Sequence, residues 1–342
     1  MNIKRKLHPS ARRALTTIIC AALAAVPAAA FSAVGHDFNG DGKSDLIWRY
    51  QPTGFTAAWY MNGAQMSSYW YSTTDVPFLL WTSLGANDFN GDGKGDILWR
   101  SPSSDVLALW YGAQNGFTGE VIGETPAGWS VIANGDVNGD GKSDLIWRHD
   151  ATGQIAYWYM NGASSIGSGT VPTNAFGLRL VGVKDLNADG RADMVWSNDT
   201  TRQLWGWISA AGQPSPGNPT PTNFNVGLIA NYSSASTPFA LGDVTADGRA
   251  DIYWRYPAAQ QFGYWQMSGT TVQNQTVVST PLPSDHVFVN TGDYNGDGRD
   301  DIVWNDVGTG LFLWKCACNG FTPELIVDYP SPSIPAGWVP VL

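Results

Sequence analysis

The feature that most constrains this chain is a thirteen-residue segment that occurs six times. Its first copy reads Asp-Phe-Asn-Gly-Asp-Gly-Lys-Ser-Asp-Leu-Ile-Trp-Arg and starts at Asp37. The other copies start at Asp88, Asp136, Asp185, Asp243 and Asp293. The intervals of 51, 48, 49, 58 and 50 residues match the length of a four-stranded propeller blade, about 40 to 50 residues, and exclude the nine-residue repeat of a β-roll.

Each repeat also contains two Trp residues at a constant distance. They are eleven residues apart in five repeats, as in Trp48 and Trp59, and ten apart in the last, at Trp304 and Trp314. A Gly-containing turn lies between them, and an Asn-Gly pair such as Asn161-Gly162 often follows. This pattern predicts a β-hairpin in every repeat. An apolar stretch before each Asp segment, such as residues 129–133, supplies a further strand.

The two ends of the chain predict how the array closes. Pro126-Ala127-Gly128-Trp129 precedes the third Asp segment, and the same pattern returns at Pro335-Ala336-Gly337-Trp338 with no Asp segment after it. We therefore predict an all-β propeller of six four-stranded blades, closed by the C-terminal strand, because closure removes exposed sheet edges. A seventh, degenerate blade in the longest interval is the alternative. We interpret its Pro-rich residues 214–219 as a loop insertion.

Residues 1–30 are predicted to be a secretory signal peptide. Five Lys and Arg residues precede an apolar run from Ala14 to Ala30, and Ala28-Ala29-Ala30 offers small residues for cleavage. Ile19 before Cys20 does not fit a lipoprotein signal, which needs a small residue there. We predict an exported protein that is extracellular, periplasmic or at the cell surface, with residues 31–342 as its propeller domain and no transmembrane segment after processing.

Acidic residues are concentrated in the repeated segments. Without the five basic residues of the leader, 14 Lys and Arg face 29 Asp and Glu, a net charge of −15. Three Asp residues in each of six segments account for 18 of these acids, so the rest of the domain carries 11 acids against 14 bases. This low basicity argues against nucleic acid as a partner. The clustered carboxylates repel one another unless a cation lies between them.

The Asp segments have the spacing of calcium ligands. Side-chain oxygens at positions one, three, five and nine, with the carbonyl of position seven, provide the oxygen donors that Ca²⁺ prefers. The predicted ligands are Asp37, Asn39, Asp41, Lys43 and Asp45; Asp88, Asn90, Asp92, Lys94 and Asp96; Asp136, Asn138, Asp140, Lys142 and Asp144; Asp185, Asn187, Asp189, Arg191 and Asp193; Asp243, Thr245, Asp247, Arg249 and Asp251; and Asp293, Asn295, Asp297, Arg299 and Asp301.

Up to six Ca²⁺ ions are thus predicted, with the weakest site in the fifth loop because Thr245 replaces Asn. The alternative is that the segments are ordinary turns, which Asp, Asn and Gly favour without metal. EF-hand and dockerin loops do not fit, since they need an acidic ligand at position twelve and an exiting helix. Position twelve is Trp here, as at Trp48.

These residues resemble the FG-GAP and VCBS repeats of bacterial secreted proteins and, more distantly, the calcium-loop blades of the integrin α-chain propeller. The resemblance rests on the Asp segment, the Leu-Ile-Trp-Arg strand after it and the Trp-Tyr-Met-Asn-Gly hairpin. It covers essentially residues 31–342. It implies a propeller with metal in a loop between two strands of each blade. Members have adhesive, lectin-like and enzyme-appended roles, so the resemblance does not assign an activity.

Other candidate functional residues are few. Most Trp residues occupy repeated positions, which indicates blade packing, whereas Trp70 and Trp205 lie outside them and are the better candidates for ligand contact. Cys316 and Cys318 occupy a predicted hairpin turn, where a small disulfide is the expected pairing.

Catalytic motifs are missing from the sequence: it has neither a Gly-x-Ser-x-Gly nor a His-Glu-x-x-His segment. We predict no catalytic residues and a non-enzymatic recognition or adhesion module, lectin-like in one form, that binds a glycan or a protein surface. The alternative is a carbohydrate-active enzyme, a glycosidase or polysaccharide lyase, on the same scaffold. The oligomeric state is left open.

Overall fold

Each repeat folds into four antiparallel strands. The computed structural model describes residues 36–50, 54–72, 81–113, 116–211, 222–282, 285–306, 310–317, 320–326 and 338–340. The predicted signal peptide, residues 1–30, lies outside these ranges. In the strand after the third Asp segment, Leu145 and Trp147 face one neighbouring blade while Ile146 faces the other. Both faces of the sheet are thus covered, which explains the near-continuous apolar run.

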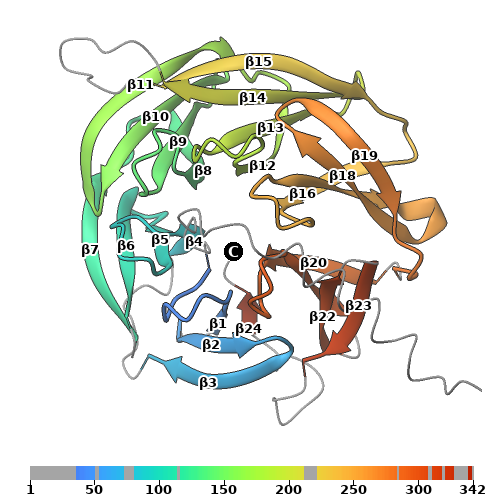
Figure 1. The fold of residues 1–342 in the computed structure, drawn as a ribbon. Helices are drawn as coiled ribbons and strands as arrows, with labels where there is room; N and C mark the ends of the chain where they lie inside the picture. Colours follow the sequence, from blue (N-terminus) through green and yellow to red (C-terminus); the bar gives the residue numbers. More distant parts are fainter. Residues whose placement is uncertain are drawn as a thin grey trace, which may run out of the picture. The chain divides into compact units, whose positions relative to one another are not determined.

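The structure contains six four-stranded sheets, as predicted, and we number these blades 1 to 6 along the chain (Figure 1). Blade 1 contains β24 (Trp338–Pro340), β1 (Leu46–Tyr50), β2 (Thr56–Asn62) and β3 (Gln65–Tyr71); blade 2 contains β4 (Thr82–Asn87), β5 (Asp96–Arg100), β6 (Val106–Ala113) and β7 (Gly116–Glu124); blade 3 contains β8 (Trp129–Gly135), β9 (Asp144–His149), β10 (Gln154–Asn161) and β11 (Ser164–Asn174).

The second half of the ring repeats this pattern. Blade 4 contains β12 (Arg179–Lys184), β13 (Asp193–Asn198), β14 (Gln203–Ala211) and β15 (Thr222–Asn231); blade 5 contains β16 (Thr237–Gly242), β17 (Asp251–Tyr256), β18 (Gln261–Ser268) and β19 (Thr271–Val277); blade 6 contains β20 (His286–Gly292), β21 (Asp301–Asp306), β22 (Gly310–Ala317) and β23 (Gly320–Leu325). A single 3₁₀ turn, η1 (Pro257–Ala259), interrupts the described strands. The described residues include no helix with the length and hydropathy of a membrane span.

The C-terminal strand closes the ring. β24 pairs with β1 in antiparallel register, with Trp48 opposite Pro340 and Tyr50 opposite Trp338. The first blade is therefore assembled from both ends of the domain, as the repeated Pro-Ala-Gly-Trp pattern predicted. The Pro-rich residues 214–219, predicted to be a loop insertion, fall between β14 and β15 of blade 4, within residues 212–221, which lie outside the described ranges. The described strands form six sheets, so the longest interval does not add a seventh blade to them.

The hydrophobic core consists of six clusters, one at each contact between neighbouring blades. The cluster between blades 6 and 1 contains Leu46 and Trp48 of one and Val303 and Leu313 of the other. The two repeated Trp residues pack against each other within each blade, with tilted rings whose centroids lie 4.2–5.2 Å apart in blades 1 to 5. In blade 6, where the spacing is one residue shorter, the separation is 6.4 Å.

Candidate metal centre

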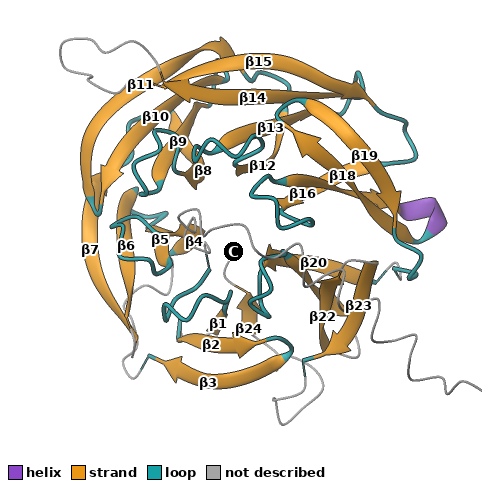
Figure 2. Ribbon diagram, viewed as in Figure 1, coloured by secondary structure: helices purple, strands orange, loops and turns teal. Residues whose placement is uncertain are grey.

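Five of the six Asp segments form the loops that join the first two strands of their blades. The first segment, residues 37–45, leads directly into β1 of blade 1, because the neighbouring strand β24 comes from the other end of the domain. In blade 3 the loop leaves β8 at Gly135 and enters β9 at Asp144. Figure 2 shows these loops in teal, grouped around the middle of the ring. The first strand of each blade runs toward its loop and the second runs away from it. All six loops therefore occupy the same end of their blades.

The first residue of each loop organises the backbone that follows. Asp37 accepts hydrogen bonds from the N–H groups of Gly40 (2.7 Å) and Asp41 (3.1 Å) through Oδ1, and from Gly42 (2.7 Å) through Oδ2. Gly40 and Gly42 have φ angles of +80° and +82°, a region that glycine enters without steric cost. The result is a tight loop whose N–H groups point inward at one carboxylate.

The polar side chains at positions three and five each accept a further hydrogen bond from a backbone N–H group two residues later in the loop. Asn39 Oδ1 accepts the N–H of Asp41 at 2.8 Å, and Asp41 Oδ1 accepts the N–H of Lys43 at 3.0 Å. Such side-chain-to-backbone bonds two residues apart are Asx turns, as the alternative interpretation of the sequence expected. They use one oxygen of each side chain and leave further lone pairs on the loop.

The aspartate at position nine has a structural role that the sequence did not reveal. Asp45 is 1% exposed. Its Oδ2 accepts the N–H of Phe38 at 2.9 Å, and its Oδ1 accepts that of Met61, on β2, at 2.9 Å. The carboxylate therefore clasps the start of the loop to the end of the second strand.

The same clasp occurs in all six blades. The position-nine aspartates and the two residues whose N–H groups each accepts are Asp45 with Phe38 and Met61, Asp96 with Phe89 and Gly112, Asp144 with Val137 and Met160, Asp193 with Leu186 and Ser209, Asp251 with Val244 and Met267, and Asp301 with Tyr294 and Cys316, at 2.7–3.3 Å. A signal was present in the sequence, since the aspartate and its partner at the hairpin end are sixteen residues apart in five blades and fifteen apart in the sixth.

Burial disfavours the ionised form of these carboxylates and so raises their pKa values. Desolvation raises the pKa of Asp45, Asp144 and Asp301 to about 8, and that of Asp96, Asp193 and Asp251 to about 7. It also raises the pKa of Asp37 at position one, although backbone N–H groups act in the opposite direction. Neighbouring loop carboxylates raise the pKa values further. A bound cation would remove this penalty by stabilising the charged forms.

In the described loops, the ion pairs involve positions five and eight rather than the buried aspartates of positions one and nine. Lys94 pairs with Asp92 at 3.3 Å and Arg249 with Asp247 at 3.0 Å, while Lys184 pairs with Asp300. The donors that gather in each loop are carboxylate, amide or hydroxyl, and backbone carbonyl oxygens. This donor set suits a hard cation with six to eight oxygen ligands, so the residues present fit the predicted calcium.

Hydrogen bonds also join each loop to the next around the ring. The N–H of position eight donates to the carbonyl of position one in the loop of the preceding blade, at 2.6–2.7 Å. The donor and acceptor pairs are Gly95 and Asp37, Ser143 and Asp88, Ala192 and Asp136, Ala250 and Asp185, Asp300 and Asp243, and Ser44 and Asp293. The last pair joins blade 1 to blade 6. The six loops therefore form one closed circuit.

The basic residue at position seven reinforces this circuit. The side chain of Lys94 lies over Gly40 of the preceding loop, where a Cβ would approach its Cγ to 3.4 Å. Arg299 donates from Nη1 to the carbonyl of Val244 in the preceding loop at 2.7 Å. Position seven is Lys or Arg in all six loops. We predicted only a carbonyl ligand there, whereas the side chain packs its stem across the blade boundary.

Three loops depart from the common geometry. Ala188 and Ala246 occupy position four of the fourth and fifth loops with φ angles of +61° and +58°, where the other loops have Gly. Thr245 places its hydroxyl 3.4 Å from Asp243 Oδ1. In the sixth loop Asn295 turns its amide group toward Asp301, with Nδ2 to Oδ1 and Oδ2 distances of 3.3 and 3.2 Å. The first three loops are thus the most regular.

Comparison with known proteins identifies the repeat. FG-GAP-like repeats match residues 88–147, 136–196, 185–254 and 243–304, which together cover more than half of the chain. The chain belongs to the FG-GAP-like repeat family. The matched FG-GAP-like segments each run from one Asp loop to the strand Trp of the next blade. No curated protein matches the chain.

Solved structures resemble the FG-GAP-like chain only distantly. A chain of the nidogen–laminin complex is 11% identical, with a TM-score of 0.48 and coverage of 81% of this chain and 91% of that one. A 6-phosphogluconolactonase-like protein from Bacteroides uniformis is 10% identical, with a TM-score of 0.39 and coverage of 85% and 80%. The dihydro-heme d1 dehydrogenase NirN is 13% identical, with a TM-score of 0.38 and coverage of 84% and 55%.

The other predicted site residues of the FG-GAP-like domain lie at blade contacts. Trp70 on β3 is half-buried and contacts Phe117 of blade 2, with ring centroids 5.3 Å apart. Trp205 on β14 is half-buried and packs against the cluster between blades 3 and 4. The buried thiol of Cys316 lies 3.4 Å from the carbonyl oxygen of Val244. Its predicted disulfide partner, Cys318, lies outside the described residues.

A further group of potential ligands lies at the other end of blade 6. One ligand atom each from Asp285, His286 and Asp306 lies within 4.8 Å of the other two. Pairing of β20 with β21 places His286 opposite Asp306. The guanidinium of Arg255 donates to the His286 carbonyl at 3.1 Å. A positive charge thus already lies beside this group.

Proposed function

We propose that this FG-GAP-like protein is a calcium-stabilised propeller that serves as a non-enzymatic recognition module on an exported protein. The observation that carries the proposal is the closed circuit of six loops, each with a buried carboxylate and an oxygen-rich donor set. Calcium in the loops would stiffen one end of every blade. The remaining surface would then bind a glycan or a protein.

The donor set favours calcium over other metals. Structural zinc sites use Cys and His, and neither residue type occurs in the six loops. Magnesium demands near-ideal octahedral geometry and usually keeps several waters. A loop with five oxygen donors from alternate positions leaves little room for them. We therefore propose up to six Ca²⁺ ions, held by positions one, three, five, seven and nine.

The distribution of perturbed acids favours recognition over catalysis. A glycosidase uses a pair of carboxyl groups flanking the bond to be cleaved, one of them with a raised pKa. The described carboxyl groups with raised pKa values, such as those of Asp136 and Asp144, all belong to the Asp loops, where burial explains the shift. These acids clasp backbone and are suited to hold a cation rather than to transfer a proton.

Calcium stoichiometry is the direct test of the scaffold. Isothermal titration of chelator-treated protein, followed by elemental analysis of the dialysed complex, should give between five and six Ca²⁺ ions per chain and no other metal. The matched control is a variant with Asp185, Asp189 and Asp193 replaced by Asn, which should lose one ion. Less than one ion per wild-type chain would contradict the proposal.

Recognition needs a separate test. The calcium-loaded protein, immobilised without its leader, should retain a glycan or a protein from the cell surface of its source, and a heat-inactivated sample should not. Screening against polysaccharides for released reducing sugar provides the counter-test. Turnover abolished by changing one acid outside the loops would instead favour the enzyme alternative.

A further inference from the structure

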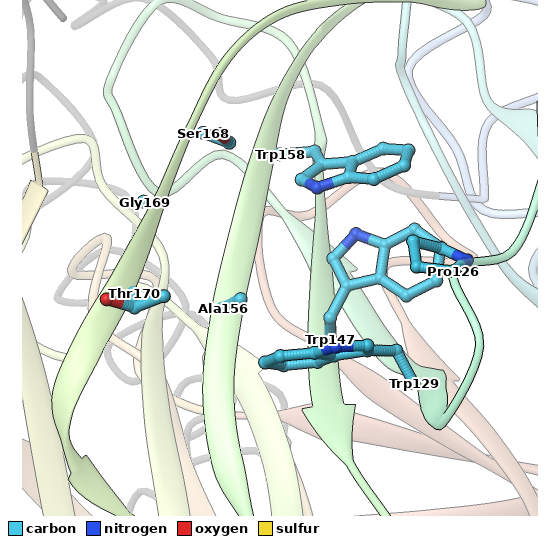
Figure 3. Close-up of a pocket in the computed structure, with 8 residues that line it drawn as sticks. All are labelled: Pro126, Trp129, Trp147, Ala156, Trp158, Ser168, Gly169 and Thr170. Carbon is cyan, nitrogen blue, oxygen red and sulfur yellow. The ribbon is translucent and has the colours of Figure 1, made fainter.

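A small aromatic pocket lies on blade 3, away from the calcium loops. It has a volume of about 210 Å³ and is bordered by Pro126, Trp129, Trp147, Ala156, Trp158, Ser168, Gly169 and Thr170. Figure 3 shows the three indoles gathered with Pro126, and Ser168, Gly169 and Thr170 on the neighbouring strand. Sites for drug-sized ligands span about 300–1,000 Å³. This pocket suits a single small ring.

The pocket lies at the end of the blade opposite the Asp loop. Trp129 opens β8, which reaches its loop only after Gly135, and Trp147 lies near the end of β9, which leaves the loop. These residues belong to the face of blade 3 that packs on blade 2. A ligand there would not touch the loop carboxylates.

Strand register explains why this position is open in blade 3. Trp147 pairs with Ala156, Ala156 with Thr170, and Trp158 with Ser168. The corresponding three residues are Ala57, Tyr71 and Tyr69 in blade 1; Ala108, Val121 and Gly119 in blade 2; Trp205, Leu228 and Val226 in blade 4; Gly263, Val277 and Gln275 in blade 5; and Phe312, Leu325 and Pro323 in blade 6. Blade 3 combines a small residue with the short hydroxyl side chains of Ser and Thr, whereas blade 1 places the bulky Tyr71 and Tyr69 at the same two positions.

The lining has the chemistry of a site for a neutral, amphipathic ring. Trp129 and Trp158 are half-buried, and the centroids of the Trp147 and Trp158 rings lie 4.6 Å apart at 49°. Aromatic faces attract the C–H face of a ring. Ser168 and Thr170, which are exposed, supply hydroxyl groups. None of the eight lining residues is charged.

An unused donor lies beside the pocket. Trp147 is 1% exposed, and its Nε1–H has no hydrogen-bond partner. The corresponding indole N–H groups of the other five blades also lack a hydrogen-bond partner, so the unpaired donor is a feature of every repeat. In blade 3, however, a pocket borders the residue. An oxygen acceptor on a ligand would satisfy a buried N–H group that otherwise costs about 1–3 kcal/mol.

We propose that this pocket binds one neutral pyranose ring of a glycan. One face of the sugar stacks on Trp158 and Trp129, a sugar oxygen accepts from Trp147, and the hydroxyls of Ser168 and Thr170 bond the outer edge. The inference rests on the proposed recognition function and assigns its ligand class. It also moves the expected ligand contact from Trp70 and Trp205 to blade 3.

The neighbouring blade offers the substitutions that test the pocket. Ala156→Trp copies Trp205 of blade 4 and fills the space. Thr170→Leu copies Leu228 and removes an exposed hydroxyl without disturbing the core. Leu228→Thr is the matched control, because it places the same hydroxyl on a blade that has Trp at the position of Ala156.

Isothermal titration should use the full calcium-loaded protein and methyl glycosides of glucose, galactose, mannose and N-acetylglucosamine. We expect at least one to bind with Kd of about 1 mM, a usual strength for few contacts. Ala156→Trp should weaken binding by at least about tenfold and Thr170→Leu by about fivefold. Leu228→Thr should bind as wild type.

Two results would overturn the assignment. One is that no glycoside binds at about 10 mM, well above the expected Kd; the other is that binding is unchanged in both blade 3 variants. The capture experiment described above distinguishes a wrong pocket assignment from a wrong recognition function. If capture persists while the pocket variants behave as wild type, the recognition role stands and the pocket assignment fails.

Discussion

The two ends of the blades differ in how closely they follow the repeat. At the loop end, every blade has an aspartate clasp at position nine, a basic residue at position seven and a hydrogen bond to the preceding loop. At the opposite end, the residues that correspond to Ala156, Ser168 and Thr170 range from Gly to Trp. The uniform end therefore holds neighbouring blades together, and the variable end is where we propose that ligand specificity arises.

Removing calcium should have the largest effect of the changes considered, because it weakens the loop end of all six blades and lowers the thermal stability of the whole domain. A ligand that binds only the native state at a hundred times its Kd stabilises it by about 2.7 kcal/mol. Six such sites add on the order of 15 kcal/mol, so chelation should lower the melting midpoint by tens of degrees. Differential scanning calorimetry in excess Ca²⁺ and in chelator measures the change. Equal midpoints would mean that the loops are metal-free turns.

A pair of substitutions in one loop should separate the clasp from the ligands. Asp45→Ala leaves the buried N–H groups of Phe38 and Met61 without acceptors. It should cost about 3 kcal/mol in chelator. Asp41→Ala removes an exposed side chain, so it should cost less than about 1 kcal/mol in chelator, while still lowering the calcium stoichiometry. Urea unfolding measures both. Equal costs in chelator would argue against the clasp.

The pH dependence of the calcium-free protein should be opposite to that of a protein stabilised by ion pairs. Burial raises the pKa of Asp45 to about 8 and that of Asp96 to about 7, whereas an unfolded Asp titrates at about 3.9. Folding therefore takes up protons. The stabilisation is complete below about pH 4 and is lost as the pH rises through 7 and 8.

Thermal melting in chelator should accordingly show a midpoint that falls as the pH rises from about 4 to about 8 and that levels off at higher pH. In excess Ca²⁺ the midpoint should stay level or rise over the same range, because the metal binds the deprotonated carboxylates. Parallel curves with and without calcium would indicate that the position-nine aspartates do not contact the metal.

The smallest effect should come from the two Ala residues at position four. Ala188 and Ala246 have positive φ angles where other loops have Gly. An L-residue with a side chain is destabilised by about 1–2 kcal/mol in that backbone region. Ala188→Gly and Ala246→Gly should each stabilise the calcium-free protein by about 0.5 kcal/mol after the entropy cost of Gly. The reverse exchange, Gly139→Ala, should destabilise it. Stabilisation by Gly139→Ala would contradict the argument.

Much of the fold could be predicted because it repeats. The interval between Asp loops, the Trp pair of each hairpin and the second Pro-Ala-Gly-Trp pattern predicted six closed blades, and β24 pairs with β1 as expected. These features are local in sequence and occur several times. The Pro-rich residues near Pro216, which were predicted to be an insertion, fall between β14 and β15 and lie outside the described residues.

Most of what was missed depends on contacts between different strands, within a blade or across a blade boundary. The sequence identified Asp45 as a ligand candidate but could not show that Met61, sixteen residues later, donates to it. Lys94 was assigned only a carbonyl role, since nothing in its own loop indicates that its side chain lies over Gly40. Trp158 was grouped with packing residues because its opening to solvent depends on the register of β10 with β11.

The sequence by itself determined the number of blades, the closure of the ring and the oxygen donors of each loop, because each follows from short-range spacing that recurs in every repeat. Only the tertiary structure decided that the loops form one hydrogen-bonded circuit and that blade 3 has a pocket. Both depend on how neighbouring sheets and strands come into register, and one residue of slip moves a side chain to the other face of its sheet.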